Sequence, residues 1–93
     1  MTISITREAS DSDYARVRAA AERFCSRHAI AYDANEPCGA EDAIDYEIDC
    51  GGHQGGPRPR LRKLWTACYC RALGVPVDVR TTIAWGYVGI SVD

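Results

Sequence analysis

The most regular hydrophobic pattern in the chain lies between residues 44 and 50. Apolar and acidic side chains alternate there without interruption, in the order Ile44, Asp45, Tyr46, Glu47, Ile48, Asp49 and Cys50. Strict alternation is typical of a β-strand with one buried face and one solvent-exposed face. The sequence therefore predicts a strand in which Asp45, Glu47 and Asp49 form an acidic row on the exposed face.

Two other stretches have the spacing of three and four residues that is typical of amphipathic helices. The first runs from Tyr14 to His28, after the segment 10–13, whose serine and aspartate side chains suit a helix start. The second runs from Leu61 to Ala72, after prolines that are favourable in a first helical turn. Gly74 marks its end. We expect one face of each helix to be buried.

The remaining patterned segments resemble strands. Residues 2–6 alternate and are rich in β-branched side chains, and residues 29–33 form a short apolar stretch that is either a frayed helix end or a brief strand. We favour a strand there, joined by a hairpin loop over residues 34–42 to the strand at 44–50. Residues 75–92 alternate with a one-residue shift at Gly86, which favours one long strand with a β-bulge over two strands joined by a tight turn.

The order strand, helix, strand, strand, helix, strand predicts an α+β fold. Two helices would pack on one face of a three- to four-stranded antiparallel sheet, and the ferredoxin-like βαββαβ order is favoured. If residues 29–33 are not a strand, the sheet has three strands and the same two helices. A chain of 93 residues offers one core, so we expect a single α+β domain over residues 1–93.

Charge is distributed unevenly along the chain. Residues 1–49 hold eleven acidic residues against five arginines, whereas residues 50–93 hold six basic residues against two acidic ones. The acidic row and two carboxylates just before it make up one candidate partner-binding set: Glu41, Asp42, Asp45, Glu47 and Asp49. Four bases make up an alternative site for anions or nucleic acid: Arg58, Arg60, Arg62 and Lys63. The alternative for the uneven charge is that the two halves neutralise each other within the fold, and the alternative for the acidic row is an ordinary solvated sheet face.

Cysteine and histidine offer two further kinds of site. Cys25 and His28 form one Cys-x-x-His pair, and Cys50 and His53 form another, so these four residues are an alternative zinc site. Cys50, Cys68 and Cys70 are candidate nucleophiles. No third group that would orient a base can be named, so the sequence does not predict an enzyme.

These observations predict a small non-enzymatic protein without a cofactor. Residues 1–9 lack the apolar core of a signal peptide, and no apolar run is long enough to span a membrane, so we expect a cytoplasmic protein with reduced thiols. In size and charge the chain resembles the small inhibitors that phages encode against host defence, such as anti-CRISPR proteins. No motif carries this resemblance, so it assigns no role to any residue.

The leading hypothesis is inhibition of a protein or nucleoprotein by an acidic strand face. That face would imitate nucleic acid and dock on a basic, nucleic-acid-binding surface of the target. Direct binding of nucleic acid by residues 58–63 is the second hypothesis, and a zinc-stabilised domain is the third. A homodimer formed through an exposed strand edge is an alternative assembly.

Overall fold

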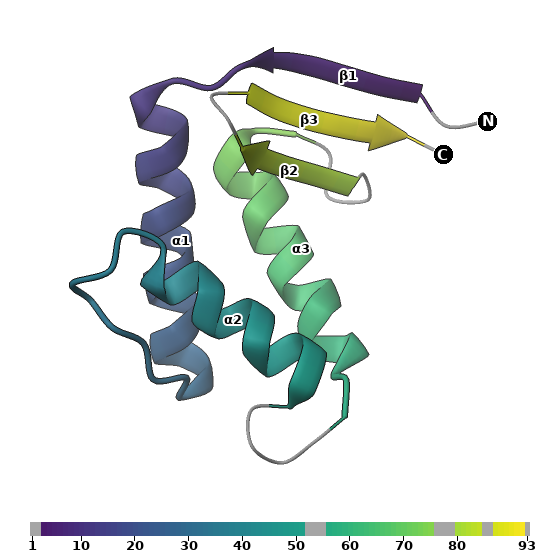
Figure 1. Cartoon of the computed structure of the whole chain (residues 1–93). Helices are drawn as coiled ribbons and strands as arrows, with labels where there is room; N and C mark the ends of the chain where they lie inside the picture. Colours follow the sequence, from purple (N-terminus) through teal and green to yellow (C-terminus); the bar gives the residue numbers. More distant parts are fainter. Residues whose placement is uncertain (1–2, 52–55, 76–79, 85–86, 93) are drawn as a thin grey trace.

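A computed structural model describes residues 3–51, 56–75, 80–84 and 87–92 (Figure 1). Its elements follow the order strand, helix, helix, helix, strand, strand: β1 (Ile3–Glu8), α1 (Asp11–His28), α2 (Gly39–Cys50), α3 (Pro59–Leu73), β2 (Arg80–Ala84) and β3 (Tyr87–Val92). The predicted ferredoxin-like order, with two helices on one face of the sheet, is therefore wrong. The main cause is residues 44–50, which form the greater part of helix α2 instead of a strand.

Helix α2 buries Ala40, Ile44 and Ile48, which are spaced four residues apart. Two of these residues also belong to the alternating pattern, because positions four apart lie on one face in both a strand and a helix. Several local features favour the helix. Alanine and glutamate are good helix formers, acidic residues occupy the first turn, and Gly51 ends the helix with a left-handed φ of 61°.

The segment between α1 and α2 contains no strand, so the predicted hairpin of residues 29–33 and 44–50 is wrong. Ala29 ends α1 in a left-handed conformation, and the following residues form an irregular connection with turns. Ile30 and Tyr32 are half-buried and pack against the core. Their apolar character reflects this packing rather than membership of a sheet.

The three strands form one antiparallel sheet with the order β1-β3-β2. Ile5 pairs with Ile90, and Thr82 pairs with Gly89. Residues 80–92 therefore contribute two neighbouring strands, and the favoured single bent strand is wrong. Residues 76–79 and 85–86 lie outside the described part of the chain, as does the proposed bulge position at Gly86.

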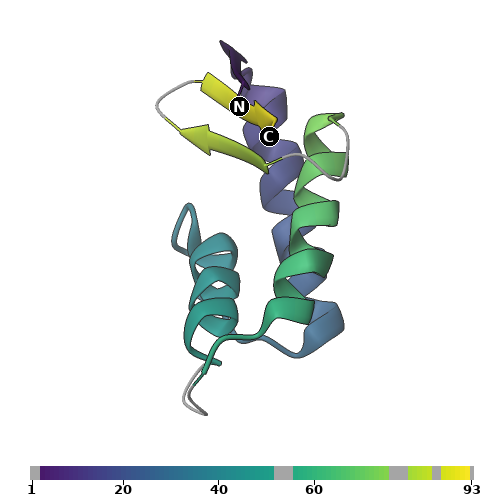
Figure 2. The same ribbon diagram turned by 90° about the vertical axis from the view of Figure 1, so that its right-hand side faces the viewer.

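Helix α1 contacts both α2 and α3. The main core cluster lies among the three helices and includes Phe24, Ile44 and Trp65. The Phe24 ring lies 5.3 Å from that of Trp65, measured between centroids. In Figure 2, α2 and the sheet both lie on one side of the α1–α3 pair, α2 below and the sheet above. The other side of this pair carries no described element.

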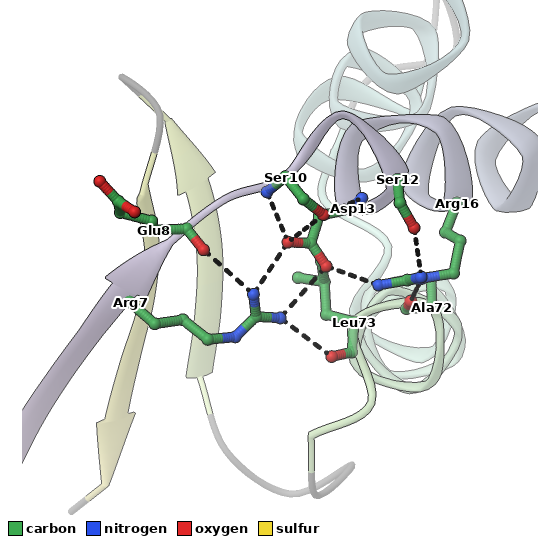
Figure 3. A network of polar contacts seen from close by, with 8 residues as sticks. All are labelled: Arg7, Glu8, Ser10, Ser12, Asp13, Arg16, Ala72 and Leu73. Carbon is green, nitrogen blue, oxygen red and sulfur yellow. Dashed lines mark hydrogen bonds and ion pairs between the residues drawn. The ribbon is translucent and has the colours of Figure 1, made fainter.

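Asp13 connects the start of α1 to its surroundings (Figure 3). Its carboxylate is 2% exposed and accepts hydrogen bonds from the backbone and hydroxyl of Ser10 and from the guanidinium groups of Arg7 and Arg16. The same Arg7 group donates to the carbonyl of Leu73 at the end of α3. These bonds tie β1, α1 and α3 together.

None of the helices in the described residues has the length and apolar character needed to cross a membrane.

Candidate binding surface on helix α2

The acidic residues of α2 do not form the single row that a strand would give. On the helix, Glu41, Asp42 and Asp45 occupy neighbouring positions at spacings of three and four residues, beside the buried face. Asp49 lies one turn further along the same side, whereas Glu47 lies on the opposite edge of the buried face. We call Glu41, Asp42 and Asp45 the acidic ridge.

Two of the five predicted acidic residues are paired within the chain. Glu47 accepts a hydrogen bond from Arg58 at 2.6 Å, and Asp49 accepts one from Arg62 at 2.5 Å. Acidic groups near a helix C-terminus and basic groups near a helix N-terminus both oppose the helix dipole. These two ion pairs place opposite charges at the adjoining ends of α2 and α3, so each charge offsets the unfavourable interaction of the other with its helix dipole. Glu47 and Asp49 are therefore neutralised within the fold.

The acidic ridge forms no such ion pair, although Arg18 attracts Glu41 and Arg62 attracts Asp45 at longer range. No ion pair joins Glu41, Asp42 or Asp45 to a basic residue in the described ranges. Burial, together with the neighbouring carboxylates, raises the pKa of Glu41, although a hydrogen bond from the Cys38 thiol works in the opposite direction. Burial also raises the pKa of Asp45, with repulsion from Asp49 and Asp42. The ridge is thus a set of like charges held together at some energetic cost.

This cost predicts that neutral substitutions on the ridge stabilise the protein. Because the folded state raises the pKa of Glu41 and Asp45, their ionised forms destabilise the fold at pH 7, and this cost is lost as the pH falls through the folded pKa. We expect Asp45→Asn to raise the midpoint of thermal unfolding by about 1–3 °C at pH 7, and Glu41→Gln to raise it by less because Glu41 lies in the first turn of α2, where the helix dipole favours a carboxylate. The gain should shrink towards pH 4. Differential scanning calorimetry at both pH values measures it.

The matched control is Glu36→Gln, in the exposed loop before α2. It should leave the midpoint unchanged within about 1 °C, as is usual for surface substitutions. If Glu41→Gln and Asp45→Asn lowered the midpoint at pH 7, the ridge carboxylates would be stabilising and the description above would be wrong.

Tyr46 is the residue that the strand hypothesis misplaced most clearly. A strand would direct it into the core beside Ile44, but on α2 it is 48% exposed, four residues after Asp42. Exposed tyrosines next to charged residues are common at the centre of protein interfaces. Helical spacing from the buried residues Ala40, Ile44 and Ile48 was the signal that could have placed it at the surface.

The predicted basic site at residues 58–63 is partly used within the chain. Arg58 and Arg62 are in the ion pairs with α2, whereas Arg60 and Lys63 are exposed on the first turns of α3. Two of the four bases therefore remain for an anion, which weakens the nucleic-acid hypothesis for this segment.

The four residues of the zinc hypothesis occupy unlike environments. Cys25 is buried, and its thiol donates to the carbonyl of Ala40 at 3.6 Å. The His28 ring packs on Phe24 with centroids 4.2 Å apart. Cys50 is exposed at the end of α2, and His53 lies outside the described residues. Nowhere in the described ranges do three or more possible ligands gather as a metal site would need.

The remaining cysteines do not support nucleophilic chemistry. Cys70 is buried and Cys68 is half-buried. Cys38 is exposed, but the neighbouring carboxylate of Glu41 raises the pKa of its thiol, and burial raises the pKa of Cys25. A raised pKa keeps a thiol protonated at neutral pH and so reduces its reactivity.

Comparisons of the chain with protein-family models, with curated proteins and with solved structures found no match.

Proposed function

We propose that the protein is a non-enzymatic binding protein that uses the acidic ridge of α2 to dock on a basic surface of a macromolecular partner. The observation that carries this proposal is the grouping of Glu41, Asp42 and Asp45 without an ion pair to any basic residue in the described ranges, although two other acids of the same helix form ion pairs. Repulsion among these carboxylates would be relieved when a cationic surface covers them.

The pKa values of the ridge support this interpretation. Burial raises the pKa values of Glu41 and Asp45, and repulsion from neighbouring carboxylates raises them further. Arginine or lysine side chains of a partner would lower these pKa values, and linkage requires that the same interaction strengthen binding at neutral pH. Opposite potentials on the two surfaces would also accelerate association.

Tyr46 would serve as the apolar anchor of the interface. It lies beside the ridge and exposes almost half of its surface. An aromatic residue surrounded by charged groups provides packing at the centre and charge complementarity around it. The ridge and Tyr46 together therefore offer both kinds of contact.

A nucleic-acid-binding surface is the kind of basic surface that fits this function best. Carboxylates on the solvent side of a helix would take the positions of phosphates, and the bound protein would exclude nucleic acid from the target. The overall size and acidic charge are also similar to those of phage-encoded inhibitors of host defence. The mechanism is competition, which requires no catalysis.

Charge reversal tests the proposal. We expect Asp42→Lys/Asp45→Lys to lose at least about tenfold in affinity for the partner, since several charge-complementary contacts become repulsive. Partners captured from host extract by the wild-type protein would be identified by mass spectrometry. The affinity of each captured partner for the wild-type protein and for the Asp42→Lys/Asp45→Lys variant would then be measured by surface plasmon resonance.

The matched control is Glu8→Lys/Asp11→Lys, which changes the net charge equally with exposed residues of β1 and α1. It should bind within about threefold of the wild type, and far-UV circular dichroism should confirm that both variants fold. Equal affinity of the Asp42→Lys/Asp45→Lys variant and the wild type for every captured partner would overturn the proposal.

A further inference from the structure

A groove of about 470 Å³ is lined by residues of α1 and α3. Its floor consists mainly of small and apolar side chains, among them Ala20, Cys68 and Ala72. Its rim carries four arginines: Arg16, Arg23, Arg27 and Arg71. We call it the arginine groove. It is separate from the acidic ridge, which lies on α2.

Three of the four rim arginines are unused within the described chain. Arg16 is fully engaged, since its guanidinium donates to Asp13, to the Ser12 hydroxyl and to the carbonyl of Ala72. Arg23, Arg27 and Arg71 have neither a hydrogen bond nor an ion pair with any described residue. Three exposed guanidinium groups without a counter-charge among the described residues favour an anionic occupant.

The groove is elongated. Along α1 it extends from Arg16 to Arg27, a rise of about 16 Å at 1.5 Å per residue. On α3, Leu64 lies one turn before Cys68 on the same face and is 52% exposed. The apolar surface therefore continues along α3 beyond the floor. An occupant that fits must be long, apolar on one face and negatively charged at its edges.

We propose that the arginine groove binds an amphipathic helix of a partner protein, with apolar residues on one face and glutamate or aspartate on both flanks. Small floor residues allow a third helix to approach α1 and α3 closely, and about 16 Å accommodates three helical turns. The apolar face would cover Ala20, Cys68 and Leu64. The flanking carboxylates would pair with Arg23 and Arg27 on one side and Arg71 on the other, in the geometry that favours arginine.

Two other occupants fit less well. Single-stranded nucleic acid binds by stacking bases on exposed aromatic rings, but Phe24, the groove's aromatic residue, is 1% exposed. A second copy would have to offer its acidic helix α2, but the apolar face of that helix is already buried against α1. A separate acidic helix provides both the charge and the apolar face.

A designed peptide tests the proposal on the full-length protein. The probe is a fluorescein-labelled 16-residue helix with leucine and alanine on one face and glutamate on both flanks, and its control has glutamine in place of every glutamate. Fluorescence anisotropy should show binding of the glutamate peptide, and the glutamine peptide should bind at least about tenfold more weakly. The double variant Arg23→Gln/Arg71→Gln should also lose about tenfold or more.

The matched control variant is Arg18→Gln/Lys63→Gln, which removes the same charge from other faces of α1 and α3 and should bind within about twofold of the wild type. The acidic-ridge variant Asp42→Lys/Asp45→Lys should also retain peptide binding, which separates this proposal from the function proposed above. Four results would each overturn the proposal. Three of them are equal affinity for both peptides, equal loss in the Arg23→Gln/Arg71→Gln and Arg18→Gln/Lys63→Gln variants, and displacement of the peptide by an oligonucleotide that binds more tightly. Dimerisation that Arg23→Gln/Arg71→Gln abolishes would instead assign the groove to a second copy and would also overturn it.

Discussion

Replacement of Asp13 by asparagine is expected to lower the midpoint of thermal unfolding by about 10 °C or more. The carboxylate is buried and lies 2.8 Å from a guanidinium nitrogen of Arg7 and 2.6 Å from one of Arg16. Asparagine has the same shape, but it carries no charge and has one acceptor oxygen instead of two. Both guanidinium groups would lose their counter-charge, and the capping box that Asp13 forms with Ser10 would be weakened. Calorimetry measures the midpoint.

Asp13 also makes the stability of the fold depend on pH in a predictable way. The hydrogen bond from the Arg7 side chain, with that from the Ser10 backbone, holds the pKa of Asp13 well below its usual range. An unfolded aspartate titrates near pH 4, so the unfolded state binds the additional proton. The stabilisation is complete above about pH 5 and is lost as the pH falls further. The wild-type midpoint should fall more steeply than that of Asp13→Asn between about pH 5 and pH 2.

The control for both measurements is Asp11→Asn in the same helical turn. Asp11 is exposed and is not part of the network in Figure 3. Its removal should cost only the small interaction with the helix dipole, or about 2–3 °C. If Asp13→Asn and Asp11→Asn had the same midpoint and the same pH profile, the buried network would contribute nothing specific to stability.

Local sequence signals were sufficient for α1 and α3 because each helix combines several of them. α1 begins at the predicted serine and aspartate residues and buries Val17, Ala21 and Phe24 at helical spacing. α3 begins at a proline and ends before Gly74, as predicted. In both helices the periodic pattern agrees with the start signal, and in α3 it also agrees with the stop signal at Gly74. Agreement among independent signals makes such an element predictable.

The helix α2 could not be identified by alternation alone. Seven residues are too few to separate a period of two from one of 3.6 when the strongest apolar residues are four apart. Ile44 and Ile48 satisfy both patterns, whereas Tyr46 and Cys50 satisfy only the strand. The deciding interaction is tertiary, because α2 packs on α1 and leaves Tyr46 exposed. This packing agrees with the local helix signals of α2 and excludes the strand.

The candidate sites show the same dependence on tertiary structure. The sequence indicated an acidic cluster, but the pairing of Glu47 with Arg58 and of Asp49 with Arg62 requires the start of α3 to lie beside the end of α2. The arginine groove was not identified, although Arg16, Arg23 and Arg27 recur at spacings of seven and four residues. That spacing marks a basic stripe on α1. The partner face on α3 becomes evident only when the two helices lie side by side.

Ile44 and Tyr46 separate the stability of α2 from its binding function. Ile44 is fully buried, so Ile44→Ala should reduce the free energy of unfolding by about 2–5 kcal/mol through lost burial and the resulting cavity. Tyr46→Ala should cost less than about 1 kcal/mol, because nearly half of the side chain is already exposed. In a strand, both side chains would face the core and both substitutions would be severe. Urea denaturation followed by circular dichroism measures both values.

The binding measurement should give the opposite ranking. Tyr46→Ala should weaken the partner complex by at least about tenfold, since exposed tyrosines beside charged groups often dominate interface energies. Ile44→Ala, studied at a temperature where it remains folded, should bind within about threefold of the wild type. A Tyr46→Ala variant that unfolds like Ile44→Ala would contradict the helical placement of this residue. One that folds and binds normally would remove Tyr46 from the interface. If the two rankings are opposite, one helix supports the fold with its buried face and binds the partner with its exposed one.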